Sequence, residues 1–215
     1  MSCITIAQHT LHLLSAKALY VEDLNTLLVS DVHLGKSETF QAHGIPIPNQ
    51  VNRSTLDRLT ALCQTHAVQH LYILGDLFHS RAALTDSVLT EWRQFVQAIA
   101  ANICLIIGNH DRALIPHLQT LDIEYVCDSI QWGGLLLSHE PECHPVHLNI
   151  CGHVHPCLKI KTKLDQLRLP CFYWEKSHNR LTLPSFGEFT GGYEVSISTD
   201  AIAYVIADDA VIPFP

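Results

Sequence analysis

The stretch LNTLLVSDVH, residues 24–33, shows the pattern from which the fold can be predicted. Residues 24–30 are mostly apolar or β-branched, so they predict a short buried strand. Asp31 and His33 follow that strand at once, and both side chains can bind a metal ion. The same arrangement, a short apolar run that ends in a polar cluster, recurs at residues 70–74, 103–107, 135–138 and 148–151.

Helical patterns separate the first three of these runs. Ser54 can cap one helix, which has apolar residues at positions 56, 59, 62 and 63 on one face. Thr85 or Asp86 can cap a second, which has apolar residues at 88, 89, 92, 95, 96 and 99. This alternation predicts parallel strands joined by crossover helices.

The last third of the chain has no comparable helical pattern. Its strand candidates are residues 158–162, 171–174, 180–183, 193–198 and 202–206. The sequence shows no repeat or linker, so we expect a single domain over residues 1–215. The fold class is α/β, with two packed sheets, helices outside them and an antiparallel addition.

Composition limits the functions to consider. The chain has 215 residues, of which 47% are hydrophobic and 16% charged, as in a packed globular protein. Its net charge of −8 argues against coating duplex DNA through a broad basic face. It leaves open a nucleic-acid substrate at a site where bound cations supply the positive charge.

The sequence also bears on the compartment. No signal-peptide pattern opens the sequence and no long apolar window suggests a membrane span, so we expect a cytoplasmic protein without membrane contact. The eight cysteines show no C-x-x-C spacing, and we expect reduced cysteines in the core.

The polar clusters after the five runs contain side chains that can bind metals. They are Asp31, His33, Asp76, Asn109, His139, His153 and His155. The carboxyl ends of strands form the ligand-binding edge of α/β sheets, so these side chains can converge. Residues two apart on a strand point to the same side, so Asp31 with His33, and His153 with His155, can each act as a pair. A glycine precedes three of the clusters and allows a close approach of the chain.

The chemistry of this set points to two ions. Two carboxylates, one amide oxygen and four imidazoles, without a thiolate, suit hard to borderline divalent cations. Seven ligands are too many for one such ion, and Asp76 is the natural bridging carboxylate. Each motif alone could be a turn or a surface histidine. All five in order at strand ends favour a metal site.

The ordered motifs D-x-H, G-D, G-N-H-D, H and G-H-x-H resemble the calcineurin-like metallophosphoesterase superfamily. The resemblance implies a four-layer α/β/β/α sandwich of two packed mixed sheets. It also implies two metal sites that share Asp76, the first completed by Asp31, His33 and His155, the second by Asn109, His139 and His153.

The same resemblance implies roles in catalysis. His110 would face the phosphate and its leaving group, and Asp111 would orient His110. Two ions can lower the pKa of a shared water towards about 7, which gives a hydroxide that attacks phosphorus. His110 would then protonate the leaving oxygen.

Several residues near the motifs are candidates for substrate contact. Lys36, Arg81 and Arg112 follow three of the motifs and could bind phosphate. His79 is a further candidate for a position beside the ligands. The run 159–163 alternates lysine with apolar or small residues and predicts an exposed strand edge protected by charge.

The flanking sequence narrows the resemblance. The runs DVHLGK (31–36), HGIPIP (43–48), GDLFHS (75–80) and LPSFGEFTGGY (183–193) resemble the bacterial ligase-associated DNA-damage-response endonucleases. This resemblance implies a manganese-dependent phosphodiesterase that cleaves single-stranded DNA in repair. Iron, zinc and nickel are the other candidate metals, and DNA ligase and helicase repair proteins are the implied functional partners.

Two alternatives stay open. The net charge of −8 gives little electrostatic help in holding a long strand, which favours a phosphodiesterase or phosphatase acting on a small nucleotide or other phosphoester. The other is a non-catalytic binding scaffold of the same fold. Such a scaffold would be expected to have lost ligands that this chain retains.

Overall fold

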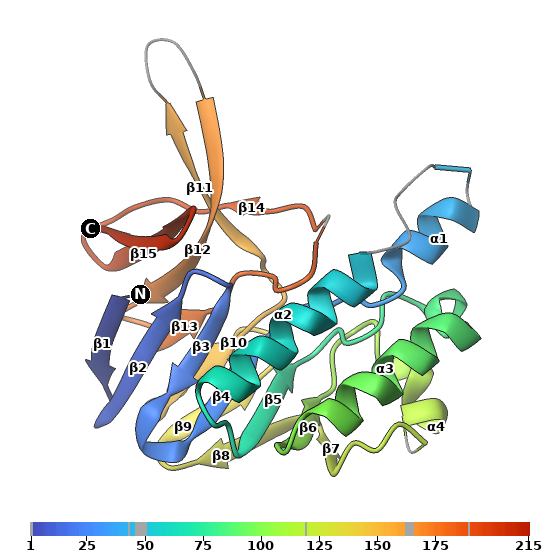
Figure 1. The fold of residues 1–215 in the computed structure, drawn as a ribbon. Coiled ribbons are helices and arrows are strands. Elements are labelled where there is room, and N and C mark those ends of the chain that lie inside the picture. Colours follow the sequence, from blue (N-terminus) through green and yellow to red (C-terminus); the bar gives the residue numbers. More distant parts are fainter. Residues whose placement is uncertain (1, 43, 46–50, 119, 162–165, 189) are drawn as a thin grey trace.

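The computed structural model describes residues 2–42, 44–45, 51–118, 120–161, 166–188 and 190–215 (Figure 1). Of the HGIPIP run, only residues 44–45 are therefore described, and Lys163 also lies outside the described residues. None of the helices in these ranges combines the length and apolar character needed to span a bilayer.

The first sheet has seven strands in chain order. They are β1 (Ser2–Ile6), β2 (His9–Leu14), β3 (Ala18–Val21), β4 (Thr26–Val29), β5 (His70–Leu74), β6 (Asn102–Ile106) and β7 (Tyr125–Cys127). Strands β1 to β4 pair antiparallel, whereas β4 to β7 are parallel, as the alternation of strands and helices predicts. The first three strands were not predicted.

Helices cover one face of this sheet, where α2 and α3 lie side by side (Figure 1). The helices are α1 (Lys36–Ala42), α2 (Val51–Thr65), α3 (Asp86–Ala98) and α4 (Ile115–Leu118), with 3-10 turns at Glu22–Leu24, Arg81–Ala83 and Arg112–Leu114. The Thr85 cap is confirmed, since its side chain accepts a hydrogen bond from Val88 N at 3.3 Å.

The predicted cap at Ser54 is wrong, because α2 begins three residues earlier at Val51. Asn52 explains the extension. Its side chain accepts from Gly35 N at 2.9 Å and donates to Glu38 at 2.8 Å. These tertiary contacts secure an extra turn that the apolar periodicity did not reveal.

The second sheet has nine strands. They are β8 (Ser129–Trp132), β9 (Leu135–Ser138), β10 (Leu148–Cys151), β11 (Pro156–Lys161), β12 (Gln166–Glu175), β13 (Arg180–Thr182), β14 (Tyr193–Glu194), β15 (Ala201–Ala207) and β16 (Ala210–Phe214). Strands β9, β10 and β13 are parallel, and most other pairs are antiparallel. The α/β class with two packed mixed sheets is confirmed. The second helical layer has no counterpart in the described residues from 120 onward, which contain only strands and loops.

Both faces of the central strands are buried, which explains their continuous apolar runs. On β4, Leu27 packs toward the helices with Leu59 and Trp92. Its neighbour Leu28 packs between the sheets with Leu137 and Ile150. The two sheets therefore share one core, and the carboxyl ends of their parallel strands lie at a common edge.

Candidate metal centre

The loops that follow β4, β5, β9 and β10 are joined by backbone hydrogen bonds. Asp31 N donates to Gly75 O at 3.1 Å and His33 N donates to Asp76 O at 2.9 Å. Gly152 N donates to His139 O at 3.0 Å, which ties the loops of the second sheet together. One set of these bonds holds the loops of Asp31, His33 and Asp76 together, and the other joins the loops of His139 and His153.

The predicted pairing of residues on a strand is wrong in its geometry. Strand β4 ends at Val29 and β10 ends at Cys151, so the candidate pairs lie in loops beyond them. Five candidate ligands adopt positive φ angles: Asp31 (55°), His33 (51°), Asp76 (54°), His153 (66°) and His155 (52°). Such conformations cost about 1–3 kcal/mol each and persist where the surroundings impose them, often at functional sites.

The glycines before the motifs allow the loops to approach closely, as predicted. A Cβ on Gly108 would lie 2.2 Å from Asp76 Oδ1, and one on Gly75 would lie 2.1 Å from His139 Nδ1. A Cβ on Gly152 would lie 1.5 Å from Ser30 Oγ. The side chains of the cluster occupy the space that these glycines leave.

Asp31, His33 and His155 form a first group, whose potential ligand atoms all lie within 4.8 Å of one another. His155 Nε2 is 2.9 Å from Asp31 Oδ1. The geometry is nevertheless poor for a hydrogen bond, and Asp31 Oδ1 and His33 Nδ1 are buried without one among the described residues. A buried carboxylate oxygen of this kind needs a cation, so the group fits a metal ion.

The ionisation states of two members, Asp31 and His33, also suit metal binding, whereas burial is outweighed at His155 by Asp31, which raises the pKa of that imidazole. Burial lowers the pKa of His33 to about 3, against the opposing influence of Asp31. Burial opposes the ionisation of Asp31, but the imidazole of His155 and a hydrogen bond from Ser30 outweigh it and lower the pKa of Asp31. A neutral imidazole and an ionised carboxylate are the forms that bind metals.

Asn109, His139 and His153 form a second group. Asn109 Oδ1 is 2.9 Å from His139 Nε2 and 3.0 Å from His153 Nδ1, and the two nitrogens are 3.1 Å apart. Ligands at about 2.1 Å from one ion, at angles of about 90–110°, are separated by roughly 3.0–3.4 Å. The spacing of these three atoms therefore fits a single metal ion as well.

Asp76 lies between the two groups. Its Oδ2 atom is 3.6 Å from His139 Nε2 and 3.9 Å from His33 Nε2, so it approaches one member of each group. Its Oδ1 atom accepts a hydrogen bond from His110 N at 2.9 Å. The carboxylate is 3% exposed, and the backbone of the GNHD motif fixes its orientation.

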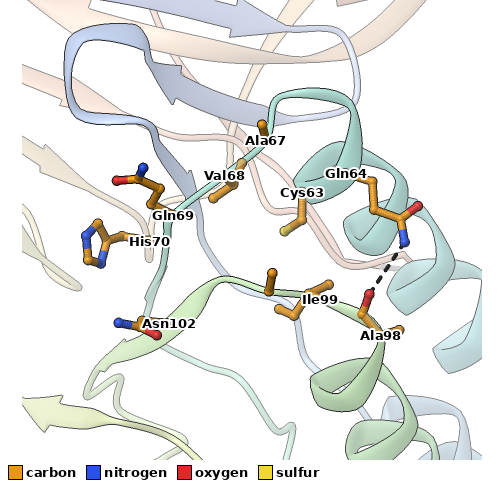
Figure 2. A pocket seen from close by; sticks show the side chains of 10 residues that line it. Cys63, Gln64, Ala67, Val68, Gln69, His70, Ala98, Ile99 and Asn102 are labelled. Carbon is orange, nitrogen blue, oxygen red and sulfur yellow. Dashed lines mark hydrogen bonds between the residues drawn. The ribbon is translucent and has the colours of Figure 1, made fainter.

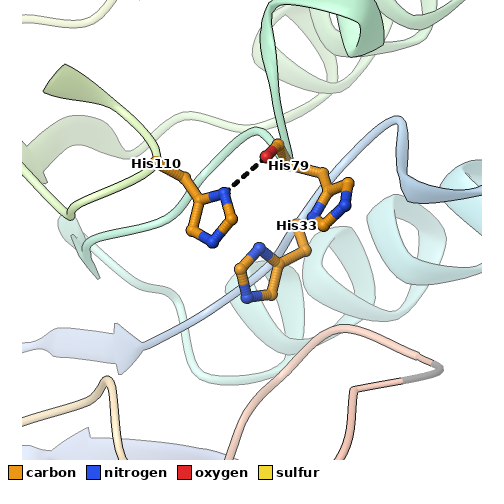
Figure 3. Close-up of side chains that lie close together, drawn as sticks. All are labelled: His33, His79 and His110. Atoms are coloured by element: carbon orange, nitrogen blue, oxygen red, sulfur yellow. Dashed lines mark hydrogen bonds between the residues drawn. The ribbon is translucent and has the colours of Figure 1, made fainter. Parts of the chain in front are cut away.

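His110 stands beside the cluster with His33 and His79 (Figure 3). Its Nδ1 atom is 2.5 Å from the backbone oxygen of His79, and the two rings stack with their centroids 5.2 Å apart. Its Nε2 atom lies 3.9 Å from Asp76 Oδ2. His79 thus lies next to the candidate ligands, and burial lowers the pKa of its imidazole to about 4.

The expectation that Asp111 orients His110 is wrong. The Asp111 carboxylate is fully buried and accepts hydrogen bonds from the backbone N–H groups of Asp76 (2.7 Å), Leu77 (3.1 Å) and Gly108 (3.0 Å). Burial raises the pKa of Asp111 to about 6, against these hydrogen bonds. Asp111 therefore holds the loops after β5 and β6 together.

The three predicted phosphate-binding cations differ in position. Lys36 is close enough to lower the pKa of both His33 and His79 by repulsion. Arg112 is exposed and lies 3.6 Å from Asp128. Arg81 lines a separate pocket of about 200 Å³ with residues such as Leu84 and His117. The structure brings only Lys36 close to the histidine cluster.

Several residues that hydrogen-bond to the candidate ligands were not predicted from the sequence. Ser30 donates to Asp31 Oδ2, and Ser185 Oγ donates to the Asp31 carbonyl at 2.9 Å. Gly187 N also donates to that carbonyl, at 3.0 Å. Farther along the same run, Tyr193 N donates to His155 O at 2.9 Å. Ser185, Gly187 and Tyr193 all belong to the LPSFGEFTGGY run, whose family resemblance is the sequence signal for their contacts.

A larger pocket, of about 700 Å³, lies at the other end of the parallel strands (Figure 2). It is lined by His70 and Asn102, the first residues of β5 and β6, and by the carboxyl ends of α2 and α3. None of the predicted ligands lines it. Size alone therefore does not identify the functional site.

A cluster of Asp, Asn and His side chains at the carboxyl ends of strands in two packed mixed sheets is typical of metal-dependent hydrolases. Residues 24–141 match the family model of the calcineurin-like phosphoesterases, and the chain belongs to that family. The predicted resemblance to this superfamily is confirmed.

Solved structures add to this comparison. The crystal structure of Pseudomonas putida nuclease MPE shares 33% sequence identity with the chain, with 99% of each chain covered and a TM-score of 0.82. YfcE, a phosphoesterase from E. coli, shares 16% identity over 87% of this chain and 96% of its own, with a TM-score of 0.48. A search of curated proteins found no match.

Proposed function

We propose that this protein is a two-metal phosphodiesterase that cleaves nucleic acid, with single-stranded DNA in repair as its substrate and manganese as its metal. The observation that carries the proposal is the position of Asp76 Oδ2, within 4 Å of a nitrogen from each of the two ligand groups. The similarity to a structure described as a nuclease supports the choice of substrate. The shared core of the two sheets supports a single domain over residues 1–215.

The residues can be assigned roles on this basis. Asp31, His33, Asp76 and His155 would hold one ion, and Asp76, Asn109, His139 and His153 the other. Two divalent ions would supply a hydroxide nucleophile and neutralise the charge on the phosphoryl oxygens. The spacing of the nitrogen and oxygen atoms within each group supports this assignment.

His110 would act on the leaving group. Its Nδ1–H donates to the backbone oxygen of His79, which fixes both the tautomer and the direction of the ring. A proton on Nε2 then makes the ring an imidazolium, which can donate to the departing oxygen. General acid catalysis of this kind contributes typically about 10²–10⁴ in rate.

Hydrolysis of a small nucleotide or other phosphoester is the second candidate, and the net charge of −8 favours it. A small substrate needs fewer cations along its length than a DNA strand does. We also propose that Lys36 contacts substrate phosphate, since it lies near His33 and His79.

A panel of manganese-supplemented assays separates these candidates. It compares a phosphodiester reporter, a phosphomonoester reporter, single-stranded DNA and cyclic nucleotides, with Asn109→Ala and His110→Ala variants. We expect Asn109→Ala to lose metal and activity, and His110→Ala to keep metal but lose most turnover. His117 is exposed, so the His117→Ala variant is the matched control and should behave as wild type.

Each outcome has a distinct meaning. Hydrolysis of monoesters alone would exclude a nuclease. Hydrolysis of small diesters but never of DNA would favour the second candidate. A fully active His110→Ala variant would show that His110 is not the general acid.

A further inference from the structure

A groove of about 320 Å³ opens beside the first ligand group and has His155 in its wall. It is formed by three parts of the chain: the turn between β2 and β3, the strands β11 and β12, and the loop after β13. Two cationic side chains, Lys17 and Arg168, line it, together with the hydroxyl-bearing Ser185 and Thr190. None of these four residues belongs to the motifs of the ligand cluster.

Lys17 has no carboxylate within 4 Å among the described residues. Glu188 exerts the main attraction on its ammonium group, but the Glu188 carboxylate is bound by Arg58 Nη1 at 2.5 Å. Burial lowers the pKa of Lys17, with Glu188 opposing this effect, so a further anion would stabilise its charged form. Lys17 also adopts a φ of 66°, a conformation in which asparagine and glycine are more common.

Arg168 likewise forms no ion pair within the described part of the chain. Its Nη2 atom donates to Gly192 O at 2.7 Å, which fixes the guanidinium at the groove. A guanidinium has five N–H donors in a planar fork that matches the oxygens of a phosphate. Nη2 also lies 3.5 Å from Cys157 Sγ, and with respect to the described residues Nε and Nη1 are left for a ligand.

The groove and the ligand cluster are parts of one surface. His155 faces Asp31 through Nε2 at 2.9 Å, and its backbone oxygen accepts from Tyr193 N at the start of β14, next to the groove residue Gly192. A chain of phosphodiesters with one phosphate at the cluster can therefore continue into the groove. Lys17 and Arg168 place two positive charges at the groove, although the net charge of the chain is −8.

We propose that Lys17 and Arg168 bind the phosphate next to the scissile phosphate of an oligonucleotide, which makes the groove the subsite that selects a strand over a small diester. The inference rests on the proposed function and adds a specificity site to it.

The test uses the charge-removing variants Lys17→Gln and Arg168→Gln in the full chain with manganese. For each, kcat/KM is measured on a single-stranded 12-mer and on bis(p-nitrophenyl) phosphate, which contains only one phosphate. We expect the ratio of the two values to fall about tenfold, as for the loss of one charge-assisted contact of about 1.4 kcal/mol. The dependence of log kcat/KM on log salt should become less steep by about 0.7, the change for one lost phosphate contact on a single strand.

Arg53→Gln and Lys176→Gln remove cations outside the groove and should leave both the ratio and the salt dependence unchanged. An unchanged ratio in Lys17→Gln and Arg168→Gln would overturn the inference, as would an equal loss on both substrates. If the wild type hydrolyses neither substrate, the proposed function fails. The affinity of the groove is then measured by fluorescence anisotropy with a labelled phosphorothioate 12-mer. Equal affinity of the wild type and both variants would overturn the inference.

Discussion

Replacing Gly152 by alanine should disable the candidate metal centre although it adds only a methyl group. The added Cβ would lie 1.5 Å from Ser30 Oγ and 2.6 Å from Asp31 Oδ2. Ser30 and Asp31 are both fully buried, so neither side chain can turn into solvent. The clash therefore displaces a candidate metal ligand and the hydroxyl that orients it.

The expected magnitudes follow from this geometry. Contacts under 3 Å force a shift, and overpacking of a buried site typically costs about 1–3 kcal/mol of stability. A displacement of about 1 Å at a catalytic group can lower the rate by roughly 10²-fold. Gly152→Ala should thus lower kcat by at least that factor and weaken metal binding, because His153 N also donates to Asp31 Oδ2 at 3.0 Å.

Three measurements check this prediction: calorimetric titration with Mn²⁺, hydrolysis of a phosphodiester reporter, and urea unfolding. Gly134→Ala is the matched control, since its φ of +87° strains the backbone but its Cβ meets no atom within 4 Å. It should lose stability without losing metal affinity. Normal Mn²⁺ binding and turnover in Gly152→Ala would refute the close packing of Ser30, Asp31 and Gly152.

Three other predictions concern the wider site. Asp111→Ala should lower the free energy of unfolding in urea by more than about 3 kcal/mol, because three buried N–H groups lose their acceptor. A decrease below about 1 kcal/mol would contradict this. Glu188→Gln should lower the free energy of unfolding by about 0.5–1 kcal/mol relative to wild type at pH 7, the usual value of a partly exposed ion pair. Burial opposes ionisation of Glu188, but Arg58 outweighs it and lowers the pKa of Glu188 below 4.5, so this difference should vanish as the pH falls through the folded-state pKa. A difference that persists at pH 3 would point to another cause. Chelation should abolish hydrolysis, and added Mn²⁺ should restore it without refolding, as far-ultraviolet circular dichroism would show; activity retained after chelation would exclude a metal-dependent reaction.

Sequence alone determined the central strands and the composition of the cluster. Runs buried on both faces must be apolar throughout, so β5, β9 and β10 were located within a residue of their ends. The ligand residues follow those runs directly, and their order carries the family resemblance. The glycines before them were also predictable, because a tight approach needs a residue without a side chain.

Local sequence patterns predicted less where contacts with residues distant in the sequence determine the structure. Strand β1 alternates polar and apolar residues and β3 has only four residues, so neither gives a long apolar run. The start of α2 depends on contacts of Asn52 with a distant loop. Asp111 seemed a partner for the adjacent His110, yet its carboxylate binds N–H groups from the loop after β5. Sequence proximity does not reveal such contacts between loops.

The sequence by itself therefore determined which side chains are candidates for the metal centre, because strand-end placement follows from the local hydrophobic pattern. Only the tertiary structure decided how they meet. Positive φ angles direct Asp31, Asp76 and His155 into the cluster. Ser185 contacts Asp31 from 154 residues away in the sequence, and Tyr193 contacts His155 from the start of β14. The groove lined by Lys17 and Arg168 likewise exists only after folding, because its walls come from opposite ends of the chain.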